Sequence, residues 1–284
     1  MEAGVARAAP VGAGAGRAPG EGVRLHMFEG GSIKCRVHNV KMGQGQGEPF
    51  EFPVPWFVIE HPSGLAVIDG GMAPGVAEDP LRHWGPIANT YWPVMSPSQA
   101  CVPTLEAAGF DPGDVRYLLQ SHLHLDHSGG LAQIDHFPNA EVIATRVDYE
   151  YAHAPDWYAD AVYIDEDFRK PGIRWALLDS NADGYDVFGD GAIRCWQTPG
   201  HAPGHQSFEV KLPNSGAYML TIDAAYTTDH WEERALPGFI ASAVDTVRSV
   251  KKLHHLARRS SATVVTGHDP DAWPTFKHSP EAYD

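Results

Sequence analysis

The stretch SHLHLDHSGG at residues 121–130 crowds four side chains of metal-binding type into six positions. These side chains are His122, His124, Asp126 and His127. A hydrophobic core gains nothing from such a cluster, because each buried polar group must find a partner or cost free energy. We therefore expect either a solvated loop or a metal site, and the remaining sequence has to decide between them.

Three further residues of ligand type each follow a predicted strand: His201, Asp223 and His268. In layered α/β proteins, functional groups commonly lie on loops just beyond the carboxyl ends of strands. Most single histidines are surface or core residues, and we expect this for His205 in the same motif as His201. Four strand ends that all carry ligand-type residues nevertheless favour one shared metal site.

The expected elements alternate between strands and helices after an initial block of strands. Strands are predicted within 23–40 (two, with a glycine turn between them), 55–71 (a hairpin), 115–122, 140–145, 192–212, 217–226 and 261–269. Helices are predicted at 101–109, after residue 128 and at 239–257. Residues 43–53 are expected to form a flexible loop, and the long irregular segment 72–100 is typical of a lid, a binding loop or a contact surface. This order indicates a single mixed α/β layered domain over 23–284.

Composition narrows the class of protein. The 284 residues carry a formal net charge of −15, which disfavours nucleic acid as a partner. The three cysteines are scattered and unpaired in the sequence, which suits a reducing cytoplasm. No apolar run approaches the roughly 18 residues of a transmembrane helix, so no membrane partner is expected. Residues 1–22 are rich in Ala, Gly and Pro and are predicted to be a disordered tail.

The motifs resemble those of the metallo-β-lactamase superfamily, whose HxHxDH signature matches residues 122–127. The superfamily's later motifs match TPGHAPGHQS at His201, LTIDAAY at Asp223 and VTGHD at His268. Its early Asp-x-Gly motif matches Asp69-Gly70-Gly71. The chain is most similar to the N-acyl-homoserine lactone lactonases, which share a tyrosine at the position of Tyr226. The likeness covers about residues 23–270.

This resemblance implies an αββα sandwich with two divalent metal ions. One ion would be held by His122, His124 and His201, the other by Asp126, His127 and His268, with Asp223 bridging the two. Zinc is the first expectation, and iron, cobalt or manganese also suit imidazole and carboxylate ligands. Asp69 would orient a ligand histidine through its other ring nitrogen; an aspartate that merely starts a glycine turn is the equal alternative.

The implied activity is opening of the lactone ring of N-acyl-homoserine lactones, which quenches bacterial signalling. A hydroxide bridging the metals would attack the lactone carbonyl. Tyr226 would help to stabilise the oxyanion, and Asp126 would pass a proton to the departing alkoxide. The partner is then a neutral small-molecule lactone.

Three alternatives stay open at this point. The same scaffold could hydrolyse an aryl ester, a thioester or a phosphoester. An iron-dependent redox enzyme is disfavoured, because the second ligand set is complete and no flavodoxin-like module follows. A metal-stabilised binding module without catalysis would not require the placed tyrosine.

The aromatic residues of the segment 72–100 are candidates for binding the acyl chain of the substrate. Trp84, Tyr91 and Trp92 could line an apolar pocket beside Tyr226. They could equally pack a private loop core or form the contact of a homodimer. The sequence does not separate these three roles.

Overall fold

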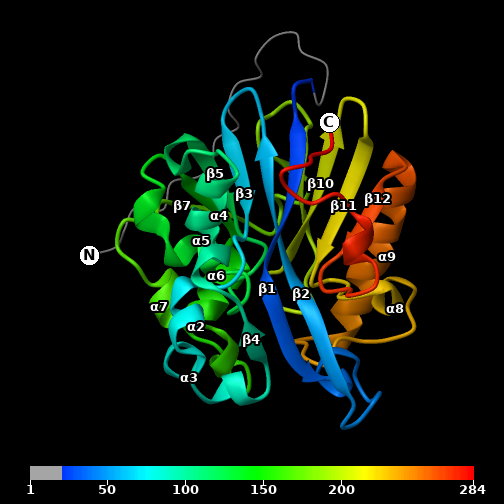
Figure 1. The fold of residues 1–284 in the computed structure, drawn as a ribbon. Helices are drawn as coiled ribbons and strands as arrows, with labels where there is room; N and C mark the ends of the chain where they lie inside the picture. Colours follow the sequence, from blue (N-terminus) through cyan, green and yellow to red (C-terminus); the bar gives the residue numbers. More distant parts are fainter. Residues whose placement is uncertain (1–20) are drawn as a thin grey trace.

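The computed structural model describes residues 21–284, which form two β-sheets packed face to face with helices on both outer sides (Figure 1). The tail predicted at 1–22 lies almost wholly outside the described residues. The arrangement is the αββα sandwich expected from the motifs. Helices α2 to α7 cover the larger sheet, and α8 and α9 cover the smaller one (Figure 1).

The larger sheet has seven strands and carries the first half of the chain. In spatial order they are β4 (Trp92–Val94), β1 (Arg24–Arg36), β2 (Pro49–Glu60), β3 (Leu65–Ile68), β5 (Val115–Leu119), β6 (Glu141–Thr145) and β7 (Trp175–Leu178). Strands β1 to β3 pair antiparallel, whereas β3, β5, β6 and β7 run parallel. The parallel strands therefore all end at the same edge of the sheet.

The smaller sheet has five strands from the second half of the chain. Their order is β12 (Thr263–Thr266), β11 (Gly216–Ile222), β10 (Gln206–Leu212), β9 (Ile193–Gln197) and β8 (Tyr185–Asp186). Strand β12 pairs parallel with β11, and the other neighbours pair antiparallel. The carboxyl ends of β9, β11 and β12 are the ones that carry the remaining ligand-type residues.

The helices are short apart from the last one. Their bounds are α1 (Val37–Val40), α2 (Pro74–Glu78), α3 (Pro80–His83), α4 (Cys101–Ala107), α5 (Gly129–Ala132), α6 (Arg146–His153), α7 (Asp165–Phe168), α8 (Thr228–Trp231) and α9 (Ala243–Ser260). Single 3₁₀ turns occur at η1 (Gly85–Asn89), η2 (Pro97–Gln99), η3 (Pro112–Asp114), η4 (Ile134–His136), η5 (Asp160–Val162) and η6 (Trp273–Thr275).

Side chains alternate between the two faces of the larger sheet, so this sheet contributes to two hydrophobic cores. Leu25 and Met27 of β1 pack between the sheets, together with Phe208 of β10. Phe28 points to the other side and packs with Trp56 against the helices. Successive side chains of a strand face opposite sides, so a sheet buried on both sides needs apolar residues at nearly every position.

Strand β1 differs from the sequence prediction, because it is one strand and not two. Its pairing with β2 shifts register between Glu29 and Ser32, where the glycine pair Gly30–Gly31 lies. Gly31 has a φ of 99°, a conformation that glycine adopts without steric cost. The glycines therefore make a bulge that lets the strand continue, where a turn was predicted.

Two other boundaries also move. Helix α9 begins at Ala243 and not at 239, because the Ser242 side chain accepts a hydrogen bond from the Asp245 backbone and caps the helix. Segment 72–100 contains several short elements, including the edge strand β4 that pairs with β1. Strand β2 already begins at Pro49, so only the first part of the predicted flexible loop 43–53 is a loop.

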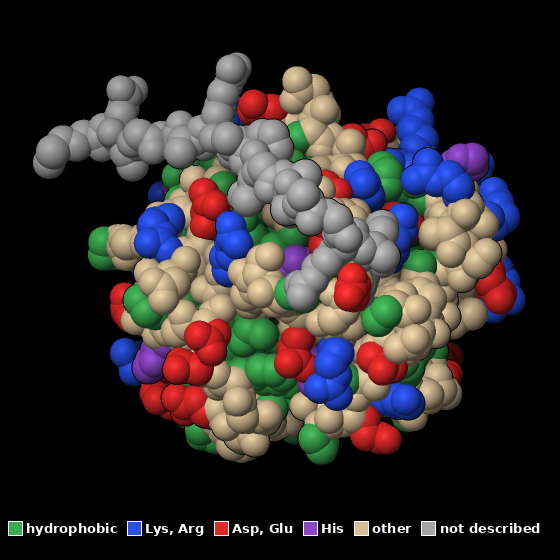
Figure 2. Space-filling view, turned by 90° about the horizontal axis from the view of Figure 1, so that it is seen from above, with side chains coloured by type: hydrophobic (Ala, Val, Ile, Leu, Met, Phe, Trp, Pro, Cys, Tyr) green, Lys and Arg blue, Asp and Glu red, His purple; other side chains and the backbone are tan. Residues whose placement is uncertain are grey.

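Surface charge on the face seen from above is mixed. Acidic and basic side chains are interspersed over most of that face, with several basic ones together at one side (Figure 2). Within residues 21–284, none of the helices has the length and hydropathy needed to cross a membrane.

Candidate metal centre

The ligand-type residues predicted from separate motifs come together where the strands of both sheets end. His122 and His124 follow β5, and His201 follows β9. Asp223 directly follows β11, and His268 lies just past β12. All of these side chains are buried, although they are polar. Burial of so many polar groups is costly unless they share partners or a bound cation.

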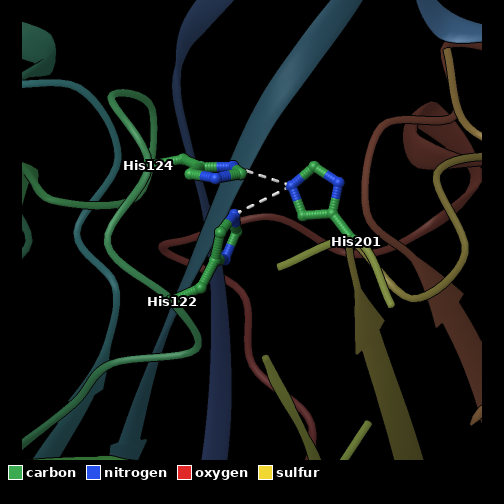
Figure 3. A group of neighbouring side chains, drawn as sticks. All are labelled: His122, His124 and His201. Atoms are coloured by element: carbon green, nitrogen blue, oxygen red, sulfur yellow. Dashed lines mark hydrogen bonds between the residues drawn. The ribbon is translucent and has the colours of Figure 1, made fainter. Parts of the chain in front are cut away.

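The first group of donors is formed by three histidines. His201 Nε2 lies 3.1 Å from His122 Nε2 and 2.8 Å from His124 Nδ1 (Figure 3). The three rings come from two different sheets and point toward one another. Converging imidazole nitrogens of this kind can hold a divalent metal ion.

The second group consists of Asp126, His127 and His268, whose donor atoms also lie close enough to hold a metal ion. Asp223 stands between the two groups and turns one oxygen to each. Its Oδ2 is 3.2 Å from His201 Nε2, whereas its Oδ1 is 3.0 Å from His268 Nε2. The Oδ1 is also 3.4 Å from His127 Nε2. The geometry is that of a carboxylate shared by two sites.

Each of four histidines has its second ring nitrogen engaged away from the cleft. His122 Nδ1 faces Ser121 Oγ (3.0 Å), His127 Nδ1 faces Asp69 Oδ2 (2.9 Å), His201 Nδ1 faces Phe239 O (3.1 Å) and His268 Nδ1 faces Pro53 O (2.9 Å). A proton on the outer nitrogen leaves the lone pair of Nε2 directed into the cleft, and such outer partners fix the orientation of metal-binding histidines. His124 is the exception, because it presents Nδ1.

Asp69 has the orienting geometry and not only that of a turn residue. Besides His127, its carboxylate accepts hydrogen bonds from the Ser121 backbone (2.7 Å) and the Ser121 hydroxyl (2.8 Å). Burial raises the pKa of Asp69, and the contact with His127 opposes this effect. Asp69 thus connects the end of β3 to both ends of the histidine motif.

The pKa shifts and the unpartnered buried atoms of the centre favour the binding of a cation. Burial and the neighbouring rings lower the pKa of His122 and of His124, so both are neutral, which is the form that binds metals. Burial alone would raise the pKa of Asp223, but His127 and His268 hold it well below its usual range. His127 Nε2 and Asp223 Oδ1 are buried without a hydrogen-bond partner. A divalent cation satisfies these atoms together, so the residues present fit the metal.

Tyr226 lies at the edge of the centre, three positions after Asp223. Its hydroxyl is 3.0 Å from His201 Nδ1, and its side chain is buried. When His201 Nε2 binds a cation, Nδ1 keeps its proton, which faces both Phe239 O and the tyrosine oxygen, so the hydroxyl of Tyr226 cannot donate to Nδ1. The hydroxyl proton of Tyr226 is then left for an acceptor in the cleft. Burial and the charge of Asp223 raise the pKa of this phenol, which keeps it protonated.

A cavity of about 50 Å³ opens beside the centre. Asp126, Asp223 and Tyr226 contribute polar atoms to its wall. The rest of the lining is largely apolar and includes Ile33, Val40, Phe52, Tyr91, Leu125, Val162 and Phe239. Its walls therefore come from distant parts of the chain: β1, α1, β2, the loop before β4, the loop after β5, η5, the segment after β11 and the loop before α9.

The sequence-based pocket is corrected in two of its aromatic residues. Tyr91 lines the cavity, and its hydroxyl donates to Asn39 O at 3.2 Å. Trp84 is buried in the core beneath the helices, and Trp92 is 43% exposed on the edge strand β4. Neither tryptophan belongs to the described lining of the cavity. Strand β4 turns the side chain of Trp92 outward and that of Pro93 inward. Phe239 was not assigned to the pocket from the sequence, because the amphipathic pattern placed it at the start of the predicted helix 239–257.

Comparison with known proteins gives matches over most of the chain. The profile of the Metallo-beta-lactamase superfamily matches residues 49–268. An N-acyl homoserine lactonase AttM of Agrobacterium fabrum is 59% identical over 262 residues, which cover 92% of this chain and 98% of that protein. An N-acyl homoserine lactonase of Bacillus thuringiensis is 26% identical over 261 residues, covering 91% of this chain and 98% of the relative.

The solved structures point the same way. An N-acyl homoserine lactone hydrolase, with the product N-hexanoyl-L-homoserine bound at its catalytic metal centre, superposes with a TM-score of 0.82 at 25% identity and covers 94% of this chain and 100% of that one. The dizinc quorum-quenching lactonase AidC shares the fold, with a TM-score of 0.66 at 16% identity and 94% coverage of both chains. With the motifs, the sandwich and the converging donors in place, the chain belongs to the metallo-β-lactamase superfamily.

Proposed function

We propose that this protein opens the lactone ring of N-acyl-homoserine lactones by metal-dependent hydrolysis. The observation that carries the proposal is the pair of donor groups joined by Asp223, with Tyr226 and an apolar cavity beside them. The names of the relatives at 59% and 26% identity support the same substrate class.

Two divalent cations are proposed as cofactors. His122, His124 and His201 hold one, Asp126, His127 and His268 hold the other, and Asp223 is shared. When bound, such a pair supplies a hydroxide nucleophile near neutral pH and polarises the substrate carbonyl. The donors are imidazoles and carboxylates, which suit zinc and also iron, cobalt and manganese.

The protein's own residues bind the substrate and manage its protons. The Tyr226 hydroxyl, whose oxygen accepts from His201, donates its proton to the carbonyl oxygen as negative charge develops there. Asp126 lines the cavity and is the most exposed of the seven donors, so its carboxylate can take up the proton that the nucleophile releases as it adds to the carbonyl and pass it to the leaving alkoxide. Phe52, Tyr91 and Phe239 enclose the acyl chain and keep water from it.

The proposal is tested by steady-state rates on a matched panel of substrates. The panel contains an N-hexanoyl-homoserine lactone, an aryl ester, a thioester and a phosphodiester. We expect the lactone to have the highest kcat/KM, with activity lost on chelation and restored by about two divalent ions per chain. A thioester or phosphodiester with the higher kcat/KM would replace the lactone assignment with one of the other hydrolases.

Acyl-chain preference should depend on Phe239 and not on Trp92. Each buried methylene contributes about 0.8 kcal/mol, so kcat/KM should rise by roughly fourfold per methylene until the apolar cavity is full. Phe239→Ala keeps the backbone carbonyl that faces His201 Nδ1, so it should flatten this rise without loss of metal. Trp92→Ala is the matched control, because its ring is exposed on β4. If Trp92→Ala flattens the series instead, the acyl chain lies against β4 and not in the cavity.

A further inference from the structure

A buried chain of hydrogen bonds runs from Asp223 into the smaller sheet through His205. The Asp223 backbone N–H donates to His205 Nε2 at 3.1 Å. His205 Nδ1 lies 2.8 Å from Thr198 Oγ1, which lies 2.8 Å from Ser207 Oγ. The Ser207 hydroxyl donates to Thr221 O at 2.8 Å. None of the side chains of Thr198, His205 and Ser207 is exposed to solvent.

The two ends of this chain of hydrogen bonds determine which atom carries each proton along it. The carbonyl of Thr221 can only accept, so the Ser207 proton is directed there and Ser207 Oγ accepts from Thr198. Thr198 Oγ1 in turn accepts from Nδ1–H of His205. At the other end, the Asp223 N–H can only donate, so His205 Nε2 must carry a lone pair. Both ends therefore require the same neutral tautomer of His205, with the proton on Nδ1.

The backbone that His205 contacts is strained. Ile222, the last residue of β11, has a φ of 48°, which is a true outlier for a β-branched residue. The pairing of β11 with β12 shifts register between Leu220 and Ile222. A Cβ on Gly267 would lie 2.5 Å from Ile222 O, so the backbone just after β12 packs directly against this turn. Such strain persists only where the surroundings hold it in place.

The turn redirects Asp223 from the sheet into the cleft. Without the strained residue, the chain would continue along β11 and carry the carboxylate away from the histidines. The N–H of Asp223, which follows the strained residue, is buried, and a buried N–H without a partner is destabilising. His205 supplies that partner from the loop between β9 and β10, and the same loop also carries His201.

We propose that His205 is a positioning residue, a neutral ring that holds the Asp223 backbone so that the carboxylate stays shared between the two donor groups. The inference rests on the proposed function only in taking Asp223 as the shared ligand. Both ring nitrogens of His205 are occupied, which explains why it is no ligand although it lies in the same motif as His201.

A matched pair of amides tests the proposal, because the amide of glutamine reaches the position of Nε2 and that of asparagine reaches the position of Nδ1. His205→Gln keeps an acceptor for the Asp223 N–H. His205→Asn keeps only the donor to Thr198. The affinity for zinc is measured by chelator competition on the purified full-length protein, together with thermal unfolding of the metal-free form.

We expect His205→Gln to bind zinc within about threefold of the wild type and His205→Asn to bind it roughly tenfold to a hundredfold more weakly, the range for outer partners of metal ligands. The metal-free form of His205→Asn, which leaves the buried Asp223 N–H without an acceptor, should unfold at a somewhat lower temperature than that of His205→Gln. Equal affinities in both variants would overturn the positioning role and leave His205 as a packing residue.

A measurement on the wild type keeps the proposal falsifiable if His205→Asn does not fold. The ¹⁵N chemical shifts of the His205 ring report its tautomer, and we expect the proton on Nδ1. A proton on Nε2 would exclude the hydrogen bond from Asp223 and overturn the proposal. Neither readout involves a substrate, so a wild type that binds zinc but opens no lactone would refute the proposed function and leave this test intact.

Discussion

Replacing Asp223 with asparagine is expected to empty both metal positions and reduce kcat/KM by more than about a hundredfold. The Asp223 oxygens face the two donor groups separately, at 3.2 Å from His201 Nε2 and 3.0 Å from His268 Nε2. Asparagine removes the negative charge and places an N–H₂ donor where one oxygen faced a cation. The buried rings of His122 and His201 would then lose the carboxylate that faces them.

Elemental analysis and steady-state rates on the purified variant measure this effect. Asp229→Asn is the matched control, because this substitution removes the same charge away from the centre. Asp229 pairs with Lys41 and Arg234. Full occupancy of two metal ions in Asp223→Asn would show that the carboxylate is not shared, and the site would have to be described as two independent sets.

Tyr226→Phe is expected to lower kcat by roughly tenfold to a few hundredfold while the metal content is unchanged, the range for one lost oxyanion donor. The tyrosine oxygen lies 3.0 Å from His201 Nδ1, which must be protonated when Nε2 binds a cation. The phenol proton is therefore available only to a group in the cleft. Because that contact forms as charge develops on the carbonyl oxygen, the loss should appear in kcat more than in KM.

The control for this variant is Tyr218→Phe, which removes a hydroxyl from a buried tyrosine that packs against Tyr283 away from the centre. It should leave kcat unchanged. If Tyr226→Phe retains the wild-type kcat and only unfolds at a lower temperature, Tyr226 is a packing residue and the proposed mechanism loses its hydrogen-bond donor to the oxyanion.

Local patterns in the sequence were enough to indicate the donor residues and the layered fold. The spacing of His122, His124, Asp126 and His127 is a property of one short segment, so neighbouring residues alone determine that these donors lie together. Strands were predicted at 115–122 and 261–269 from short apolar runs, and the structure has them at Val115–Leu119 and Thr263–Thr266, so their existence follows from the sequence although each ends three residues before the predicted bound. That several such ends meet is a general property of layered α/β proteins.

The orientation of the donor rings, the wall of the cavity and the bulge in β1 depend on contacts between distant segments. No local sequence pattern relates the residues that make these contacts. The ring of His268 is oriented by Pro53 O, 215 positions earlier in the chain. Phe239 belongs to the cavity wall because Ser242 starts the helix after it. Gly30 and Gly31 form a bulge because β2 and β4 pair along both sides of β1. The role of His205 likewise depends on a strained turn in another strand, since backbone strain and proton positions are set only when the strands of the smaller sheet are assembled.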